Sequence, residues 1–106
     1  MAYSHIVVYI TVPSREVGEQ IAQTLVESNL AACVNIVPGI CSVYKWQGEI
    51  NHDDELLLIA KTRAALFEQL ETIVKRLHPY DMPEVIGMPI VMGSNEFLTW
   101  INVETV

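Results

Sequence analysis

Residues 32–46, ACVNIVPGICSVYKW, decide the fold of this 106-residue chain. Their β-branched and aromatic side chains predict a long strand. The pair Pro38-Gly39 in its middle predicts a bulge, because proline cannot donate to a strand ladder. A glycine-containing turn follows, and residues 49–62 run back as a second long strand that ends in the apolar run LLLIA. The two strands together predict one extended β-hairpin.

A strand and a helix are expected before the hairpin. Residues 3–12, YSHIVVYITV, are apolar on both faces, which predicts a central strand covered on each side. Ser14 is suited to cap a helix with a regular apolar face, and Asn29 is suited to close it.

A second helix and a fourth strand are expected after the hairpin. Residues 64–78 carry apolar side chains at helical spacing, and Pro79 prevents the helix from continuing. Residues 84–92 predict a short strand, which Pro89 places at an edge or a bulge. Ser94 is then positioned to cap a short final helix.

This element order predicts the α+β class with a ferredoxin-like βαββαβ arrangement. Two right-handed βαβ units with a hairpin between them close into a four-stranded antiparallel sheet with both helices on one face. The long hairpin joins the second and third strands, and the short helix is added at the C-terminal end. Residues 1–106 are expected to form a single domain. The fold supports many unrelated activities, so function must come from particular residues.

Composition restricts the class of partner. Thirteen acidic and six basic residues give a net charge of −7, which disfavours nucleic acid as a partner. The longest apolar run, residues 56–60, is too short to cross a bilayer, and the N-terminal segment lacks a signal-peptide pattern, so a cytoplasmic location is expected. Cys33 and Cys41 have neither zinc-site nor dithiol spacing.

Motifs for catalysis and for soft-metal transfer are missing. The loop after the first strand reads TVPSR, without the CxxC of a copper chaperone or the glycine-rich loop of an acylphosphatase. No nucleotide-binding, zinc-protease or serine-hydrolase motif occurs elsewhere in the sequence. We therefore expect that the protein is not an enzyme.

The stretch LHPYDMPE, residues 77–84, is the richest in chemistry. Its two prolines predict a rigid corner, and His78 is suited either to the last carbonyls of the preceding helix or to contact with a ligand. Tyr80 is suited to interface packing or to lining a cleft, and Glu84 either lines the same cleft or pairs with Lys61. The acidic turn at residues 52–55, HDDE, is expected to be exposed and only solvated, with His52 as a competing imidazole for metal.

Three segments carry a family resemblance: LAACVNIVPGICSVYKWQGEI, ELLLIAKTR and LHPYDMPEVI, at residues 30–50, 55–63 and 77–86. They are similar to the CutA divalent-cation tolerance proteins, and the resemblance extends from Leu30 to Trp100. It implies a CutA-like domain that forms a tight homotrimer, in which long hairpins join neighbouring sheets. It also implies a role in tolerance to divalent metals such as copper. The overhanging hairpin and the hydrophobic content of 51% independently favour assembly.

In such a trimer, a cleft between subunits is the expected site. Trp46, Lys61, Tyr80 and Glu84 are its candidate residues, and His78 is the candidate ligand for copper or another divalent cation. One alternative is a PII-like trimeric sensor that binds a small effector in these clefts, but the two residues Gln47-Gly48 are too short for the mobile loop it needs. A trimer that only scaffolds or anchors other proteins is a third reading.

Overall fold

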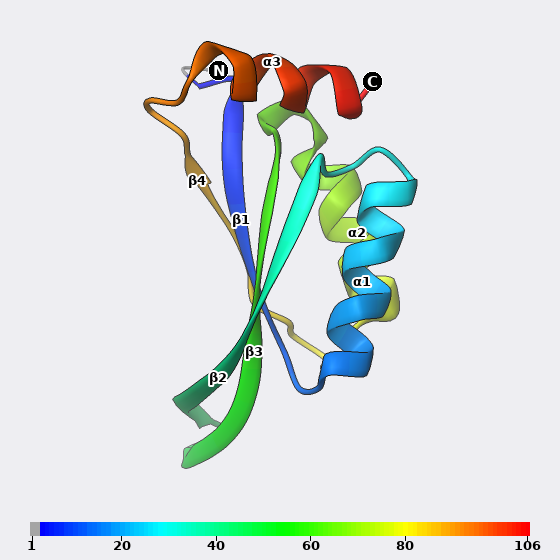
Figure 1. Ribbon diagram of the computed structural model, residues 1–106. Coiled ribbons are helices and arrows are strands. Elements are labelled where there is room, and N and C mark those ends of the chain that lie inside the picture. Colours follow the sequence, from blue (N-terminus) through cyan, green and yellow to red (C-terminus); the bar gives the residue numbers. More distant parts are fainter. Residues whose placement is uncertain (1–2) are drawn as a thin grey trace.

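Four strands and three α-helices alternate along residues 3–106, the part of the chain that this computed structural model describes (Figure 1). The strands are antiparallel neighbours in the order β2-β3-β1-β4. The α+β class and the ferredoxin-like strand order are therefore as predicted. The elements are β1 (His5–Val12), α1 (Arg15–Glu27), β2 (Cys33–Trp46), β3 (Glu49–Arg63), a 3-10 turn η1 (Ala64–Leu66), α2 (Phe67–Leu77), β4 (Val85–Pro89) and α3 (Asn95–Glu104).

Helices α1 and α2 cover one face of the sheet, and α3 crosses its end near the N-terminus (Figure 1). Alternate residues of β1 are buried, from Ile6 to Val12, and they pack with Ile21 and Leu25 of α1 and with Leu70 and Val74 of α2. Gly18 lets α1 approach the sheet closely, since a Cβ there would lie 3.1 Å from Val12 Cγ2. This single apolar layer is the core of the chain.

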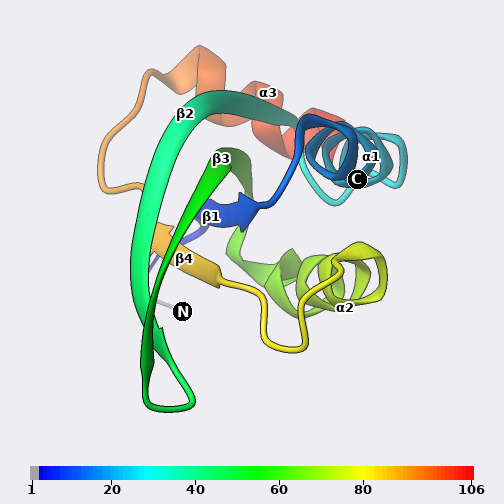
Figure 2. The ribbon, with the colours of Figure 1, turned by 90° about the horizontal axis from the view of Figure 1, so that it is seen from below.

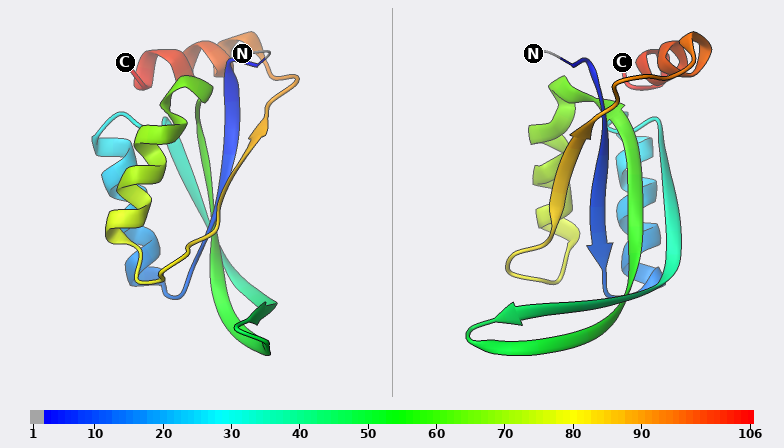
Figure 3. Two further views of the ribbon diagram at one scale, coloured as in Figure 1. Left: turned by 180° about the vertical axis from the view of Figure 1, so that it is seen from behind. Right: turned by 90° about the vertical axis from the view of Figure 1, so that its left-hand side faces the viewer.

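The expectation that the first strand is covered on both sides is only half met. β1 is central, between β3 and β4. On its second face, however, Val7, Tyr9 and Thr11 are only half-buried, because α1 and α2 both pack on the other face (Figure 3). Propensity alone does not tell a strand covered by two layers from one that leaves an apolar face open.

The hairpin of β2 and β3 extends well beyond the rest of the sheet. β1 pairs only with residues 56–63 of β3, whereas residues 49–55 pair with β2 alone in the described chain. A register shift between Val37 and Ile40 confirms the bulge at Pro38-Gly39, and the hairpin sweeps beneath the end of the sheet (Figures 2 and 3). Gln47 and Gly48, with φ of 51° and 83°, form the two-residue turn. A turn this short has no room for the mobile loop of a PII-like sensor.

The helix boundaries follow local signals closely. The Ser14 and Ser94 hydroxyls each accept a 3.2 Å hydrogen bond from the backbone N–H three residues later, and Asn29 has φ of 61° just after α1. The helix predicted at residues 64–78 differs at both ends. Its first turn is 3-10, and His78 is already extended (φ −81°, ψ 136°) because the residue before a proline avoids helical geometry.

Two strand predictions were too long. β1 starts at His5 instead of residue 3, and β4 covers residues 85–89 instead of 84–92. β4 is paired only with β1, so it lies at the edge that its proline indicated. Beyond Pro89 one further bond forms, from Ile90 N–H to the His5 carbonyl at 2.9 Å, and the chain then leaves the sheet for α3.

Candidate functional site

The imidazole of His78 is buried and engaged at both nitrogens. Nε2 lies 2.8 Å from the Thr11 carbonyl, and Nδ1 accepts a 3.1 Å hydrogen bond from the Tyr80 backbone N–H. Because Nδ1 accepts, the ring proton is on Nε2 and is donated to Thr11. The helix is capped instead by the His78 backbone N–H, which donates to the Val74 carbonyl at 2.8 Å. His78 therefore fixes the corner onto β1, and neither ring nitrogen has a lone pair left for a metal.

Tyr80 connects this corner to the hairpin. Its hydroxyl donates a 3.1 Å hydrogen bond to Glu55, whose side chain is only 6% exposed. Burial, followed by this hydrogen bond and the charge of Glu55, raises the pKa of Tyr80 to about 12. The rings of Tyr80 and His78 lie 4.7 Å apart at a tilt of 57°. Tyr80 is thus held from both sides as a neutral donor.

A second phenol–carboxylate pair lies on the hairpin itself. The Tyr44 hydroxyl donates to Asp53, and this hydrogen bond is the main reason that the pKa of Tyr44 is raised. Tyr44 is opposite Asn51 in the ladder, so Asp53 is its diagonal neighbour and shares its face of the hairpin. Both phenols therefore point their hydroxyls at carboxylates of β3.

The prediction of an exposed acidic turn at residues 52–55 is wrong. These residues lie within β3, where they pair with residues 40–43 of β2. Strand alternation separates them: His52 and Asp54 are exposed, whereas Asp53 is half-buried and Glu55 is buried. The charges suggested a solvated loop, but Glu55 is buried and accepts a hydrogen bond from Tyr80, a distant residue in the sequence.

The hairpin and the corner enclose a cavity of about 300 Å³. The loop that follows α2 and the hairpin both contribute lining residues, and the right-hand view of Figure 3 draws this loop just above the hairpin. Trp46 and Tyr80, which were predicted to share a cleft, both line this cavity within one chain. The lining consists of Tyr44, Trp46, Pro79, Tyr80, Asp81 and Met82.

Lys61 and Glu84 do not line this cavity. Lys61 lies six residues beyond Glu55 on β3, a separation of about 20 Å at the rise of a strand, and its amine donates to Asn35. Glu84 is exposed just before β4. Of the four residues predicted to form the cleft, only Trp46 and Tyr80 therefore line this cavity.

The opposite face of the hairpin carries other potential metal ligands. His52 and Asp54 are two apart on β3, and Cys41 is directly opposite Asp54 on β2. Even so, residues 3–106 contain no group of three or more histidine, cysteine or acidic side chains arranged to hold a metal ion.

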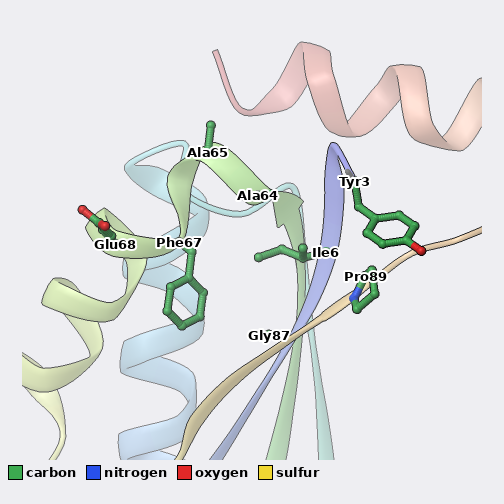
Figure 4. A pocket seen from close by; sticks show the side chains of 8 residues that line it. All are labelled: Tyr3, Ile6, Ala64, Ala65, Phe67, Glu68, Gly87 and Pro89. Atoms are coloured by element: carbon green, nitrogen blue, oxygen red, sulfur yellow. The ribbon is translucent and has the colours of Figure 1, made fainter. Parts of the chain in front are cut away.

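A larger hollow of about 520 Å³ lies at the other end of the sheet, beside β4 (Figure 4). Ile6, Phe67 and Pro89 are among its mainly apolar lining residues, and Glu68 contributes a carboxylate. It lacks the convergent polar groups that orient a ligand. The cavity at the corner is therefore the stronger candidate site.

Sequence reasoning missed the carboxylates of this site, Asp53 and Glu55, and also Tyr44. A two-residue turn at Gln47-Gly48 sets the hairpin register, so the diagonal contact of Tyr44 with Asp53 was within reach of the sequence. No local signal marked the contact of Glu55 with Tyr80.

Comparison with known proteins gives a consistent result over almost the whole chain. The family described as "CutA1 divalent ion tolerance protein" matches residues 6–104. The divalent-cation tolerance protein CutA of Thermus thermophilus is 54% identical over 99 residues, which are 93% of this chain and 96% of that protein.

Solved structures agree with the sequence match. The Thermus thermophilus divalent cation tolerance protein superposes with a TM-score of 0.94 at 53% identity, covering 96% of this chain and 99% of the other. A CutA from Archaeoglobus fulgidus, described as periplasmic, also gives 0.94, at 43% identity and coverage of 96% and 99%. The names of these relatives describe tolerance to divalent cations and no reaction.

Among residues 3–106, no helix is both long enough and apolar enough to span a membrane.

Proposed function

Because the chain belongs to the CutA1 divalent ion tolerance family, we propose that it acts in divalent-cation tolerance as a homotrimer that binds copper or another divalent cation and catalyses no reaction. The observation that carries the proposal is the overhanging hairpin. Residues 49–55 of β3 have only β2 beside them, and no third strand of the described chain supports this arm. An isolated two-stranded ribbon is marginal in water.

Exposed apolar side chains on the arm favour the same conclusion. Val43 and Ile50 are 61% and 67% exposed, and Trp46 is 41% exposed. The sheet also ends in two unpaired edges, β2 and β4, and the face of β1 that carries Tyr9 is only half-covered. Pairing between chains removes open edges and buries apolar surface. A closed ring of three copies uses each edge once.

The cation is proposed to bind where the arm of one chain meets a second chain. His52 and Asp54 are exposed on this arm and Cys41 faces Asp54, but residues 3–106 of one chain do not complete a metal site. A second chain is needed to add ligands. The cleft predicted from Trp46, Lys61, Tyr80 and Glu84 remains part of this proposal, with Tyr80 and Glu84 from one chain and Lys61 from a neighbour. A metal role for His78 requires a cation to displace the Tyr80 N–H from Nδ1.

Native mass spectrometry of untagged protein tests the proposal. We expect a mass three times the 11.9 kDa of the chain, and copper(II) bound in multiples of three after brief addition of the ion. A monomer at micromolar concentration contradicts the assembly. A trimer that takes up no divalent cation contradicts the metal role and leaves the assembly standing.

The cellular location is proposed to be cytoplasmic. The Archaeoglobus relative is described as periplasmic. A cytoplasmic location for this chain therefore means that members of the family differ in their location. Fractionation of the source cells decides between the two compartments.

A further inference from the structure

The arm of the hairpin carries a thiol and an imidazole on the face opposite to that of Trp46. Cys41 is opposite Asp54 in the ladder, and Val43 is opposite His52. Residues directly opposite each other in an antiparallel pair lie on the same face, as do residues two apart along one strand. Cys41 and His52 are therefore diagonal neighbours on one face of the arm.

The two-residue turn places these two side chains where strands bring side chains closest. The residues that flank such a turn, Trp46 and Glu49, form a hydrogen-bonded pair, and pairs of the two kinds alternate from there. Cys41 and His52 both belong to non-hydrogen-bonded pairs, in which the side chains lie closer together. Diagonal neighbours lie about 7–8 Å apart, and the right-handed twist of the hairpin shortens this diagonal. One ion can therefore contact both the thiol and the imidazole.

The number and kind of ligands on the arm select the ion. Zinc takes four ligands in structural sites, whereas residues 3–106 contain no group of three or more histidine, cysteine or acidic side chains that could hold a metal ion. Copper(I) prefers soft thiolate ligands, and two ligands in a linear arrangement are enough for it. The other two imidazoles, of His5 and His78, are already hydrogen-bonded. A single thiol–imidazole pair therefore suits copper(I) better than a divalent ion.

We propose that the Cys41 thiolate and the His52 imidazole of one arm bind copper(I). The inference rests on the metal role of the proposed function and names an ion and its ligands. A divalent cation needs further ligands from a second chain, whereas copper(I) needs only the two that the register of one hairpin brings together. Asp54, directly opposite Cys41, adds a negative charge that favours a cation beside the thiolate. The thiol loses its proton to solvent when the ion binds.

The two cysteines of β2 provide a matched pair of variants. Cys41 has His52 as its diagonal neighbour, whereas Cys33, on the same strand, is opposite Lys61 and has no imidazole beside it in the ladder. Competition with the copper(I) chelator bicinchoninate, without oxygen and with ascorbate present, measures the affinity of the assembled protein. We expect Cys41→Ser to weaken copper(I) at least about tenfold and Cys33→Ser to bind as the wild type does. Equal losses in both variants, or a loss in neither, overturn the proposal.

The ligand set and the second oxidation state complete the test. X-ray absorption at the copper edge is expected to show one sulfur and one nitrogen per copper(I), and two or more sulfurs would mean thiolates from different chains and overturn the pair.

Copper(II) separates this inference from the proposed function. We expect Cys41→Ser to leave copper(II) binding nearly unchanged and His52→Ala to weaken both forms of copper. Uptake of copper(II) together with copper(I) binding that ignores Cys41 overturns the inference alone. Copper(I) held through Cys41 by a protein that takes up no divalent cation supports the inference and contradicts the divalent site of the proposed function.

Discussion

The hydroxyl of Tyr80 donates a 3.1 Å hydrogen bond to the carboxylate of Glu55, 25 residues earlier in the sequence. The contact ties the loop after α2 to the hairpin at the point where the hairpin leaves the four-stranded part of the sheet. Glu55 is the one acidic side chain in the described chain that is buried. The corner and the arm therefore hold each other in place through one polar contact.

Removing this contact is expected to destabilise the protein. Tyr80→Phe leaves the buried carboxylate of Glu55 without its phenol donor, which costs about 1–3 kcal/mol in the free energy of unfolding. Chemical denaturation of the variant and the wild type measures the difference. Tyr3→Phe, at an exposed position away from the corner, is the control and is expected to change little. A Tyr80→Phe protein as stable as the control contradicts a role for the hydrogen bond.

Tyr80 also predicts a loss of stability at high pH. Its pKa is raised from 10.0 to about 12 in the folded chain, so the folded state favours the protonated phenol. The contribution is complete below about pH 10 and disappears as the pH rises towards about 12. Titration of tyrosinate absorbance is expected to show one late-ionising tyrosine fewer in Tyr80→Phe than in the wild type, while Tyr44, whose pKa is also raised, remains. The idea fails if the number of late-ionising tyrosines is the same in both proteins.

Trp46 is expected to support assembly as well as the cavity. It stands at the end of β2 on the overhanging arm, where a large aromatic side chain is suited to anchor a neighbouring chain. Trp46→Ala should lower the melting temperature of the assembled protein and shift its mass distribution towards smaller species in light scattering. Trp100→Ala on α3 is the comparison. Assembly that is insensitive to Trp46→Ala but sensitive to Trp100→Ala would place the interface at the opposite end of the molecule.

Copper(II) binding is expected to depend on His52 more than on His78. The imidazole of His52 is exposed, whereas both ring nitrogens of His78 are hydrogen-bonded. His52→Ala should therefore weaken copper(II), while His78→Ala should bind as the wild type does. Binding should also weaken from about pH 7.5 to about pH 5.5, because protons compete for an imidazole nitrogen. If His78→Ala alone abolishes binding, the corner opens to admit the metal and His78 is its ligand.

Glycine is expected to be needed at position 39 only because of the backbone conformation there, and not because space is short. Its φ is 84°, and a Cβ there would meet no atom within 4 Å. Gly39→Ala should therefore cost about 1–2 kcal/mol of stability through the left-handed backbone at the bulge. Gly87→Ala is the matched control, since Gly87 has ordinary contacts of 3.5 Å and no positive φ. Equal melting temperatures for the two variants would mean that the bulge relaxes without cost.

The parts of the fold that depend on neighbouring residues could be predicted from the sequence. Ser14 and Ser94 cap their helices, Pro79 ends α2, Pro38-Gly39 bulges β2, and the strand order follows from the βαββαβ pattern. Each of these rests on a preference that acts over a few residues, such as a helix cap, a missing backbone donor, or side chains that repeat every two residues in a strand or every 3.6 in a helix. Strand ends were less certain, because they depend on how far the neighbouring strand continues.

The site was decided by the tertiary structure. His78 reaches the Thr11 carbonyl across 67 positions of sequence, and the buried Glu55 accepts a hydrogen bond from Tyr80, 25 positions away. Trp46 meets the corner because the hairpin sweeps beneath the sheet (Figure 2). Sheet twist and the bulge set that path, and no spacing along the chain encodes where two distant segments cross. The sequence by itself therefore determined the elements and their caps, whereas long-range packing alone decided that Tyr80 and Trp46 line one cavity and that Tyr80 donates to the buried Glu55.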